Sequence, residues 1–131
     1  MHTKLLFGKE ARDKLLAGAT TLARAVSATL GPRGRNAIIE KLNDKPLVSR
    51  DGASVAAHIL LEDKFENLGA SLLREATQRT AELAGDGTST STVLALSLLV
   101  NGQNKMGDGI DPILLKHGME HLCLRKRMKH P

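Results

Sequence analysis

The sequence predicts a mainly α-helical fold, a helical bundle with one small β-hairpin. Two long stretches, residues 9–30 and 62–84, repeat apolar residues at steps of three and four, which is the spacing of one face of an α-helix. A third stretch, residues 93–100, is apolar at nearly every position, so we expect a helix surrounded by protein. The 131 residues contain no Trp or Tyr and only two Phe, so aliphatic side chains must build the core.

The first helix, Lys9 to Leu30, is predicted to end at Gly31-Pro32. Glycine takes the left-handed conformation that caps a helix, and proline cannot continue its hydrogen-bond ladder. The loop that follows, Arg33-Gly34-Arg35-Asn36, fits either a phosphate contact or a solvated turn, and the sequence leaves both open.

A β-hairpin is predicted next. The runs Ala37–Leu42 and Leu47–Arg50 have β-propensity and flank a turn-rich tetrapeptide, residues 43–46. The second strand leads through Asp51-Gly52 into a short apolar helix, residues 53–61. Asp51 therefore lies at a strand-to-helix corner, where it is either a carboxylate of a functional site or simply the cap of the helix.

The second long helix ends at Gly85-Asp86-Gly87, which five consecutive hydroxyl residues (88–92) follow. Such a run fits the N-terminus of a helix, where free N–H groups and hydroxyls face one anion. Asp86 would repel a phosphate there unless a divalent cation lay between them and took oxygen ligands from both. The stretch therefore predicts a phosphate with Mg²⁺, and the alternative is an ordinary loop with a Ser/Thr cap.

The last part of the sequence predicts a glycine-containing loop at residues 101–109 and a final helix that Asp111-Pro112 opens. His117 and His121 lie four apart on this helix, with Cys123 and His130 nearby. Two histidines at that spacing can share a metal ion. Because nothing fixes a third ligand, a solvated helix face is favoured over a zinc site.

The formal charge of +5 is concentrated at the end of the chain. Residues 116–131 carry a net charge of +4, which leaves +1 for the first 115 residues and disfavours nucleic-acid binding by the body of the protein.

The single cysteine rules out an internal disulfide framework. No apolar run is long enough for a signal peptide or a membrane span, so we expect a soluble, cytoplasmic protein with no membrane partner.

Four motifs, in this order and spacing, resemble the group I chaperonins, the GroEL family: Thr29-Leu30-Gly31-Pro32-Arg33-Gly34-Arg35-Asn36, Arg50-Asp51-Gly52, Leu61-Glu62-Asp63-Lys64-Phe65-Glu66-Asn67 and Gly85-Asp86-Gly87-Thr88. The resemblance runs from about Phe7 to Gly118. It implies a ring-forming ATPase that encloses non-native polypeptides. Residues 1–118 resemble the N-terminal half of the equatorial ATP-binding domain, and residues 119–131 form a divergent basic tail.

The resemblance also implies roles for individual residues. The phosphate and base side of ATP would be lined by Thr29, Leu30, Gly31 and Pro32. Asp86 would hold Mg²⁺, and the phosphate oxygens would be cradled by Gly87, Thr88, Ser89 and Thr90. Arg50 stands where the family usually has Lys, a change that alters a contact near the phosphates or toward a bound monovalent cation such as K⁺.

Asp51 is implied as one of two catalytic carboxylates at the attacking water. In the family, the second aspartate comes from a later segment that is absent from these 131 residues. The apical surface that binds unfolded polypeptide is absent from them as well. The sequence therefore leaves ATP hydrolysis by this chain open, and unfolded polypeptide is not an expected partner.

Three hypotheses follow. The first is a truncated chaperonin subunit that carries the phosphate and Mg²⁺ half of an ATP site. The alternative is a non-catalytic interaction module, which associates with chaperonin subunits or with itself through the hairpin (residues 37–50) and exposed apolar faces. The third, a nucleic-acid binder that acts through its basic tail, ranks below both because the charge is confined to the last sixteen residues.

Overall fold

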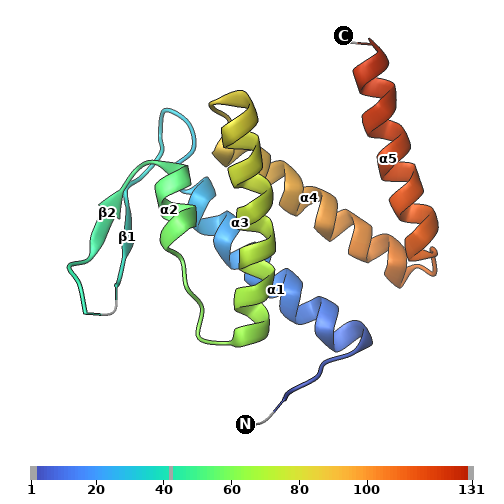
Figure 1. Cartoon of the computed structure of the whole chain (residues 1–131), viewed down its shortest axis with the longest axis horizontal. Coiled ribbons are helices and arrows are strands. Elements are labelled where there is room, and N and C mark those ends of the chain that lie inside the picture. The colour runs from blue at the N-terminus through green and yellow to red at the C-terminus, as the bar shows by residue number, and fades with distance from the viewer. Residues whose placement is uncertain (1–2, 42, 130–131) are drawn as a thin grey trace. The chain divides into compact units, whose positions relative to one another are not determined.

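The computed structural model describes residues 3–41 and 43–129, with side chains described through Arg125. Its elements confirm a mainly α fold with a two-stranded antiparallel sheet (Figure 1). They divide into two compact units, residues 1–97 and 98–131, and α4 runs through both. In chain order the elements are α1 (Gly8–Ser27), β1 (Ala37–Ile39), β2 (Leu47–Ser49), α2 (Gly52–His58), α3 (Lys64–Ala84), α4 (Thr88–Gly107) and α5 (Pro112–Lys129).

The core of the first unit lies where α1 and α3 cross. A Cβ atom on Gly18 would collide with the Glu66 backbone, and one on Gly69 would collide with the backbone of Leu15. The two helices therefore touch backbone to backbone, which only glycine permits at these positions. Around this crossing lie the buried aliphatic side chains Ala19, Leu22, Ala23, Val26, Val55, Ala56, Ala70 and Leu73.

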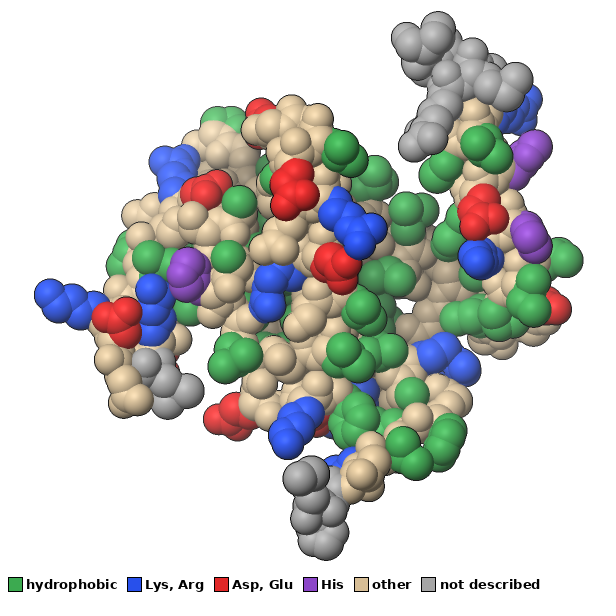
Figure 2. All heavy atoms as spheres, viewed as in Figure 1, with side chains coloured by type: hydrophobic (Ala, Val, Ile, Leu, Met, Phe, Trp, Pro, Cys, Tyr) green, Lys and Arg blue, Asp and Glu red, His purple; other side chains and the backbone are tan. Residues whose placement is uncertain are grey.

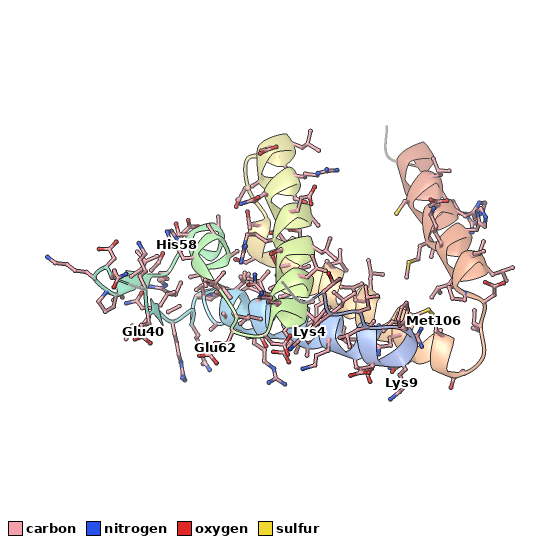
Figure 3. The ribbon with its side chains drawn as sticks, turned by 60° about the horizontal axis from the view of Figure 1, so that its bottom comes forward. Lys4, Lys9, Glu40, His58, Glu62 and Met106 are labelled. Atoms are coloured by element: carbon pink, nitrogen blue, oxygen red, sulfur yellow. The ribbon has the colours of Figure 1, made fainter. Side chains whose placement is uncertain are left out.

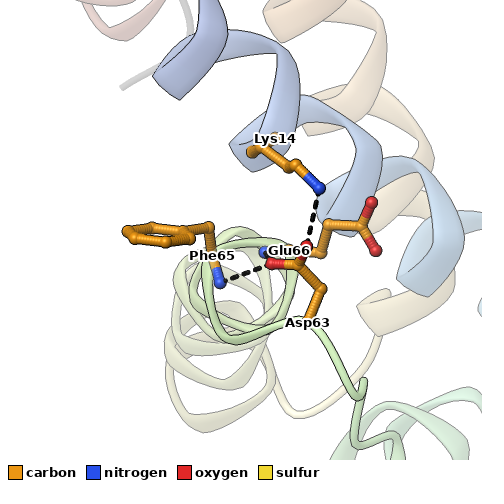
Figure 4. A network of polar contacts seen from close by, with 4 residues as sticks. All are labelled: Lys14, Asp63, Phe65 and Glu66. Atoms are coloured by element: carbon orange, nitrogen blue, oxygen red, sulfur yellow. Dashed lines mark hydrogen bonds and ion pairs between the residues drawn. The ribbon is translucent and has the colours of Figure 1, made fainter. Parts of the chain in front are cut away.

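Asp63 joins the two crossing helices and caps one of them. Its Oδ1 accepts hydrogen bonds from the N–H groups of Phe65 and Glu66, 2.9 and 3.2 Å away, at the start of α3. Its Oδ2 accepts a hydrogen bond from Lys14 Nζ of α1 at 2.6 Å (Figure 4). The hydrogen bond from Lys14 is the main reason why the pKa of Asp63 lies below its ordinary value.

The predicted helix over residues 9–30 is confirmed, but it ends at Ser27 rather than at Leu30. The hydroxyls of Ser27 and Thr29 donate to the carbonyls of Arg24 and Val26, at 3.0 and 2.6 Å. Such local bonds compete with the helical ladder, which explains the earlier end. Gly31 has the left-handed φ of +79° that was expected, but it lies in the turn after the helix.

The second long helix, α3, covers Lys64 to Ala84, so it begins two residues later than the predicted range 62–84 and ends as predicted before Gly85. Gly85 is the C-cap, with a left-handed φ of +73°. The strands are shorter than the predicted runs 37–42 and 47–50, and Leu42 lies outside the described residues. Their register pairs Ala37 with Ser49, Ile38 with Val48 and Ile39 with Leu47.

The helix that follows, α2, covers residues 52–58 instead of 53–61, because Ile59 takes an extended conformation with ψ of 124°.

Residues 101–107 are helical, so the loop predicted over residues 101–109 was wrong for most of its length. Gly102 is tolerated inside α4 because it packs against α5: its Cβ position would lie 3.3 Å from Met119 Cε and 3.5 Å from Leu115 Cδ2. The chain leaves the helix only after Gly107, and Gly109 has φ of +94°. Asp111 caps α5 as expected, since its Oδ1 accepts the Ile113 N–H at 2.9 Å.

The stretch 93–100 is a helix, but the expectation that protein surrounds it was wrong for the structure described. Val93, Leu94, Leu98 and Leu99 are all exposed, and 60% of Leu94 is accessible to solvent. Because the apolar residues run all around α4, packing by Ala95 and Leu96 against the core leaves the other sides uncovered. Hydrophobic side chains reach the surface at several places on the face drawn in Figure 2.

Candidate functional site

The beginnings of α2 and α4 meet within the first unit. A Cβ atom on Gly52 would collide with Ser89 Oγ, and it would lie 3.3 Å from Val26 Cγ1, near the end of α1. Three segments that are distant in the sequence therefore converge on this glycine. The structure brings together the Asp51-Gly52 corner and the hydroxyl run, two of the segments that the sequence analysis singled out.

The start of α4 combines left-handed glycines with N–H groups that precede the helical ladder. Gly85 and Gly87 have left-handed φ angles of +73° and +86°, and the exposed Asp86 between them accepts the Gly87 N–H at 2.7 Å. The first helical hydrogen bond runs from the Ser91 N–H to the Gly87 carbonyl at 2.8 Å. The N–H groups of residues 88–90 therefore precede the ladder, and no acceptor for them is found in the part of the chain that the structure describes.

The five hydroxyls of the run do not act as one group. Ser91 and Thr92 donate to the Thr88 carbonyl at 2.9 and 2.7 Å, and Thr92 is fully buried. These two hydroxyls are engaged within the first turn of α4, which corrects the expectation that all five face one ligand. Thr88 and Ser89 are half-buried and Thr90 is exposed, so the hydroxyls left as candidate phosphate contacts are those of these three residues.

Asp51 is the N-cap of α2. Its Oδ2 accepts the hydroxyl and the N–H of Ser54, at 2.8 and 3.2 Å, while its own N–H donates to Ser49 Oγ at 3.1 Å. The hydrogen bond from the Ser54 hydroxyl is the main reason why the pKa of Asp51 is lowered, so the ionised form of this side chain is favoured further. The capping interpretation of Asp51 is thus realised, and its role at an attacking water stays a prediction. The neighbouring Arg50 is exposed.

The turn Thr29 to Pro32 is tied to its own helix. Thr29 is buried with its hydroxyl on the Val26 carbonyl, whereas Leu30, Gly31 and Pro32 are exposed. The loop is closed by a hydrogen bond from the Arg35 N–H to the Ala28 carbonyl at 2.7 Å. No hydrogen bond between the described residues links this turn to residues 86–90.

A metal ion at Asp86 would take most of its ligands from elsewhere. Within residues 3–41 and 43–129, no three His, Cys, Asp or Glu side chains gather as a metal-binding group. One exposed carboxylate fits Mg²⁺, which usually keeps several waters and binds through one or two carboxylates plus substrate phosphates. On α5, His117, His121 and Cys123 are exposed, His117 Nδ1 lies 3.8 Å from Glu120, and His130 lies outside the described residues.

Sequence reasoning missed two residues that bond to the Asp51 side chain or to α2. Ser54 stands three residues after a helix cap, a spacing that could have indicated its bond to Asp51. Arg74 of α3 donates hydrogen bonds to the Ala56 and Ile59 carbonyls at the C-terminal end of α2, and no local sequence pattern predicts that contact.

The TCP-1/cpn60 chaperonin family model matches residues 22–129, which is more than half of the sequence. The chain therefore belongs to the TCP-1/cpn60 chaperonin family. The matched range includes residues 29–32, 50–52 and 86–90. It ends at residue 129, the last residue of α5, and so covers most of the segment 119–131. Chaperonins generally depend on ATP, generally form oligomers and are typically cytoplasmic, so the family gives this chain a chaperonin-related function.

None of the helices in the described part of the chain combines the length and the apolar character that crossing a membrane requires.

Proposed function

We propose that these residues form the phosphate and magnesium half of a chaperonin-type ATP site. The contact between Gly52 and Ser89 carries the proposal, because it sets the Asp51 corner beside the free N–H groups at the start of α4. An ionised carboxylate and an anion-binding helix start then border the same small region.

The phosphate oxygens would accept hydrogen bonds from the N–H groups of Thr88, Ser89 and Thr90, at the positive end of the α4 dipole. Mg²⁺ would bridge these oxygens to Asp86 and supply charge neutralisation. Residues 29–32 would line the base side, and the Arg50 corner is the candidate place for K⁺. Glycines 85 and 87 permit the close backbone approach that such a cradle needs.

Asp51 would orient the attacking water. An aspartate is ionised at neutral pH, and the hydrogen bond from Ser54 favours that state further; the ionised carboxylate is the form that accepts a proton or a hydrogen bond from water. In the family that the chain resembles, a second aspartate from a later segment shares this task. Positioning and electrostatic stabilisation supply most of the rate acceleration in phosphoryl transfer. A site with one of its two carboxylates therefore supports ATP binding better than ATP hydrolysis.

Calorimetric titration with ATP and Mg²⁺ tests the proposal. We expect weak binding that chelation of Mg²⁺ abolishes and that Asp86→Ala weakens about tenfold, the loss of one charge-assisted contact. Asp108→Ala removes the same charge from an exposed residue just after α4 and should leave binding unchanged. Equal binding by wild type and Asp86→Ala, or binding that survives chelation, contradicts the magnesium bridge.

A second candidate function is that of an interaction module for chaperonin subunits. The hairpin favours it, because the cross-strand pair Ile38 and Val48 is 76% and 57% exposed, and no third strand pairs with β1 or β2 among the residues that the structure describes. An added strand would satisfy an edge and cover this pair. Co-sedimentation with chaperonin rings that Ile38→Lys abolishes, while Asp86→Ala does not, would support this role. Retention of both variants by the rings would argue against it.

A further inference from the structure

Arg74 fastens the end of α2 to α3. Its Nε donates a hydrogen bond to the Ala56 carbonyl at 2.6 Å, and its Nη2 donates to the Ile59 carbonyl. The Arg74 side chain is half-buried, and its partners lie 18 and 15 positions earlier in the sequence. A planar guanidinium can serve two carbonyls at once, so this is a two-point attachment.

The Ala56 carbonyl needs this partner. A carbonyl in a helix normally accepts from the N–H four residues later, but α2 ends at His58 and Ile59 is extended. Ala56 itself is 1% exposed, so water cannot easily replace the missing donor. His58 lies at this end of α2 (Figure 3), and its Nδ1 is 2.8 Å from the Ser54 carbonyl, which is a contact within α2 rather than to α3.

The placement of α2 depends on contacts of this kind. A helix of 7 residues has too few hydrogen bonds to persist alone, so its neighbours determine where it lies. Val55 and Ala56 supply buried apolar contacts, which are not directional. The Arg74 hydrogen bonds are directional, and they fix the end of α2 that lies opposite Asp51 and Gly52.

We propose that Arg74 is a positioning residue for the ATP site. By holding one end of α2 on α3, it keeps the other end, with Asp51 and Gly52, against Ser89 at the start of α4. The helix is about 10 Å long and moves as a short rod, so a displacement at Ala56 reaches Gly52. This inference rests on the proposed function for its link to ATP, whereas the placement of α2 can be measured without nucleotide.

Hydrogen–deuterium exchange of the full chain and calorimetry with Mg²⁺ and ATP test it together. The variants are Arg74→Ala, Arg74→Lys, and Arg79→Ala as the matched control, because Arg79 lies on the same helix but bonds to Glu75 at 2.8 Å. For Arg74→Ala we expect exchange at least about tenfold faster in residues 52–58, faster exchange in residues 91 and 92, where the α4 hydrogen bonds begin, and about tenfold weaker nucleotide binding. Arg74→Lys keeps the charge and one donor nitrogen, so its exchange rates and nucleotide affinity should lie between those of Arg74→Ala and wild type. The control Arg79→Ala should match wild type.

Each result decides the inference. Wild-type exchange in residues 52–58 of Arg74→Ala overturns it. A change confined to residues 52–58, with residues 91 and 92 and nucleotide binding unaltered, also overturns it, because it would mean a purely local structural role. If the wild-type chain binds no nucleotide, the proposed ATP site fails and the exchange of residues 91 and 92 alone decides the positioning role. If circular dichroism shows that Arg74→Ala is unfolded, the same comparisons are made with Arg74→Lys.

Discussion

Gly52 and Ser89 are the pair of residues on which the candidate site depends most directly. Ser89 Oγ occupies the place where any larger residue at position 52 would put its Cβ, while Ser89 Cβ lies 3.4 Å from it, an ordinary contact distance. The severe clash therefore comes from one oxygen atom, and Val26 Cγ1 at 3.3 Å is the only other neighbour closer than an ordinary contact among the three nearest atoms. Removing the oxygen should make most of the room that a methyl group at position 52 needs.

We predict that Gly52→Ala lowers the free energy of unfolding by about 1–3 kcal/mol, the usual cost of overpacking, and that Ser89→Ala largely restores it in the double variant. Urea denaturation of the two single variants and the double variant measures the coupling. Gly118→Ala is the control, since its Cβ would meet nothing within 4 Å. If the double variant is no more stable than Gly52→Ala, residues 52 and 89 are not in contact.

At the scale of elements, the ion pair between Lys14 and Asp63 links the stability of the α1–α3 crossing to pH. The pKa of Asp63 is lowered in the folded chain, chiefly by the hydrogen bond from Lys14, and the pKa of Asp51 is lowered by Ser54. A lowered pKa means that the folded state holds the carboxylate ionised more strongly than the unfolded chain does. The stabilisation is therefore fully present above the ordinary aspartate pKa of about 3.9 and is lost as pH falls through the folded pKa.

We expect the midpoint of thermal unfolding to fall as pH decreases below about 4, and to fall less steeply in Asp63→Asn, which has already lost the ionised partner. At neutral pH the same variant should unfold at a lower temperature than wild type. Asp108→Asn, which changes an exposed aspartate after α4, provides the comparison. A pH profile of Asp63→Asn parallel to that of wild type would show that the pair does not link folding to acid.

The helices and their ends could largely be predicted because their signals are local. Periodicity placed α1 and α3, and Gly85 and Asp111 marked a helix end and a helix start, as glycine and aspartate do through backbone conformation and capping. The errors arose where distant contacts decide. Gly102 was taken as a loop residue, yet α5 packs on it and the helix continues.

The candidate site was predictable as separate segments but not as an assembly. Each motif carries its own signal, such as the hydroxyl run after Gly87 or the aspartate at a strand-to-helix corner. That Gly52 meets Ser89 depends on how α2 and α4 pack, over a separation that no local pattern spans. The use of Ser91 and Thr92 inside the helix was also hidden, because hydroxyls that bond a carbonyl and hydroxyls that face a ligand look alike in sequence.

For the whole molecule, the feature with the widest consequence is the amount of apolar side chain in contact with solvent. Leu83 on α3 is 90% exposed, and the α3 residues Leu68 and Leu72 are about half exposed. The hairpin adds the exposed Ile38 and Val48, on two strands that have no further strand partner in the described part of the chain. Burying a single side chain of this size contributes roughly 1.5–3 kcal/mol, which is large against the stability of a small domain.

We therefore predict that the chain associates, with itself or with chaperonin subunits, because association covers these side chains and pairs the strand edges. In analytical ultracentrifugation the average mass should rise across a concentration series, and a hydrophobic dye should fluoresce more strongly on the wild type than on a variant with Ile38→Lys and Leu83→Lys. The same variant should associate less, whereas Lys45→Glu, an exposed change in the hairpin turn, should not alter the oligomers. A monomer at every concentration, with cooperative unfolding and no dye binding, would mean that these surfaces are stable in water and that their exposure drives no assembly.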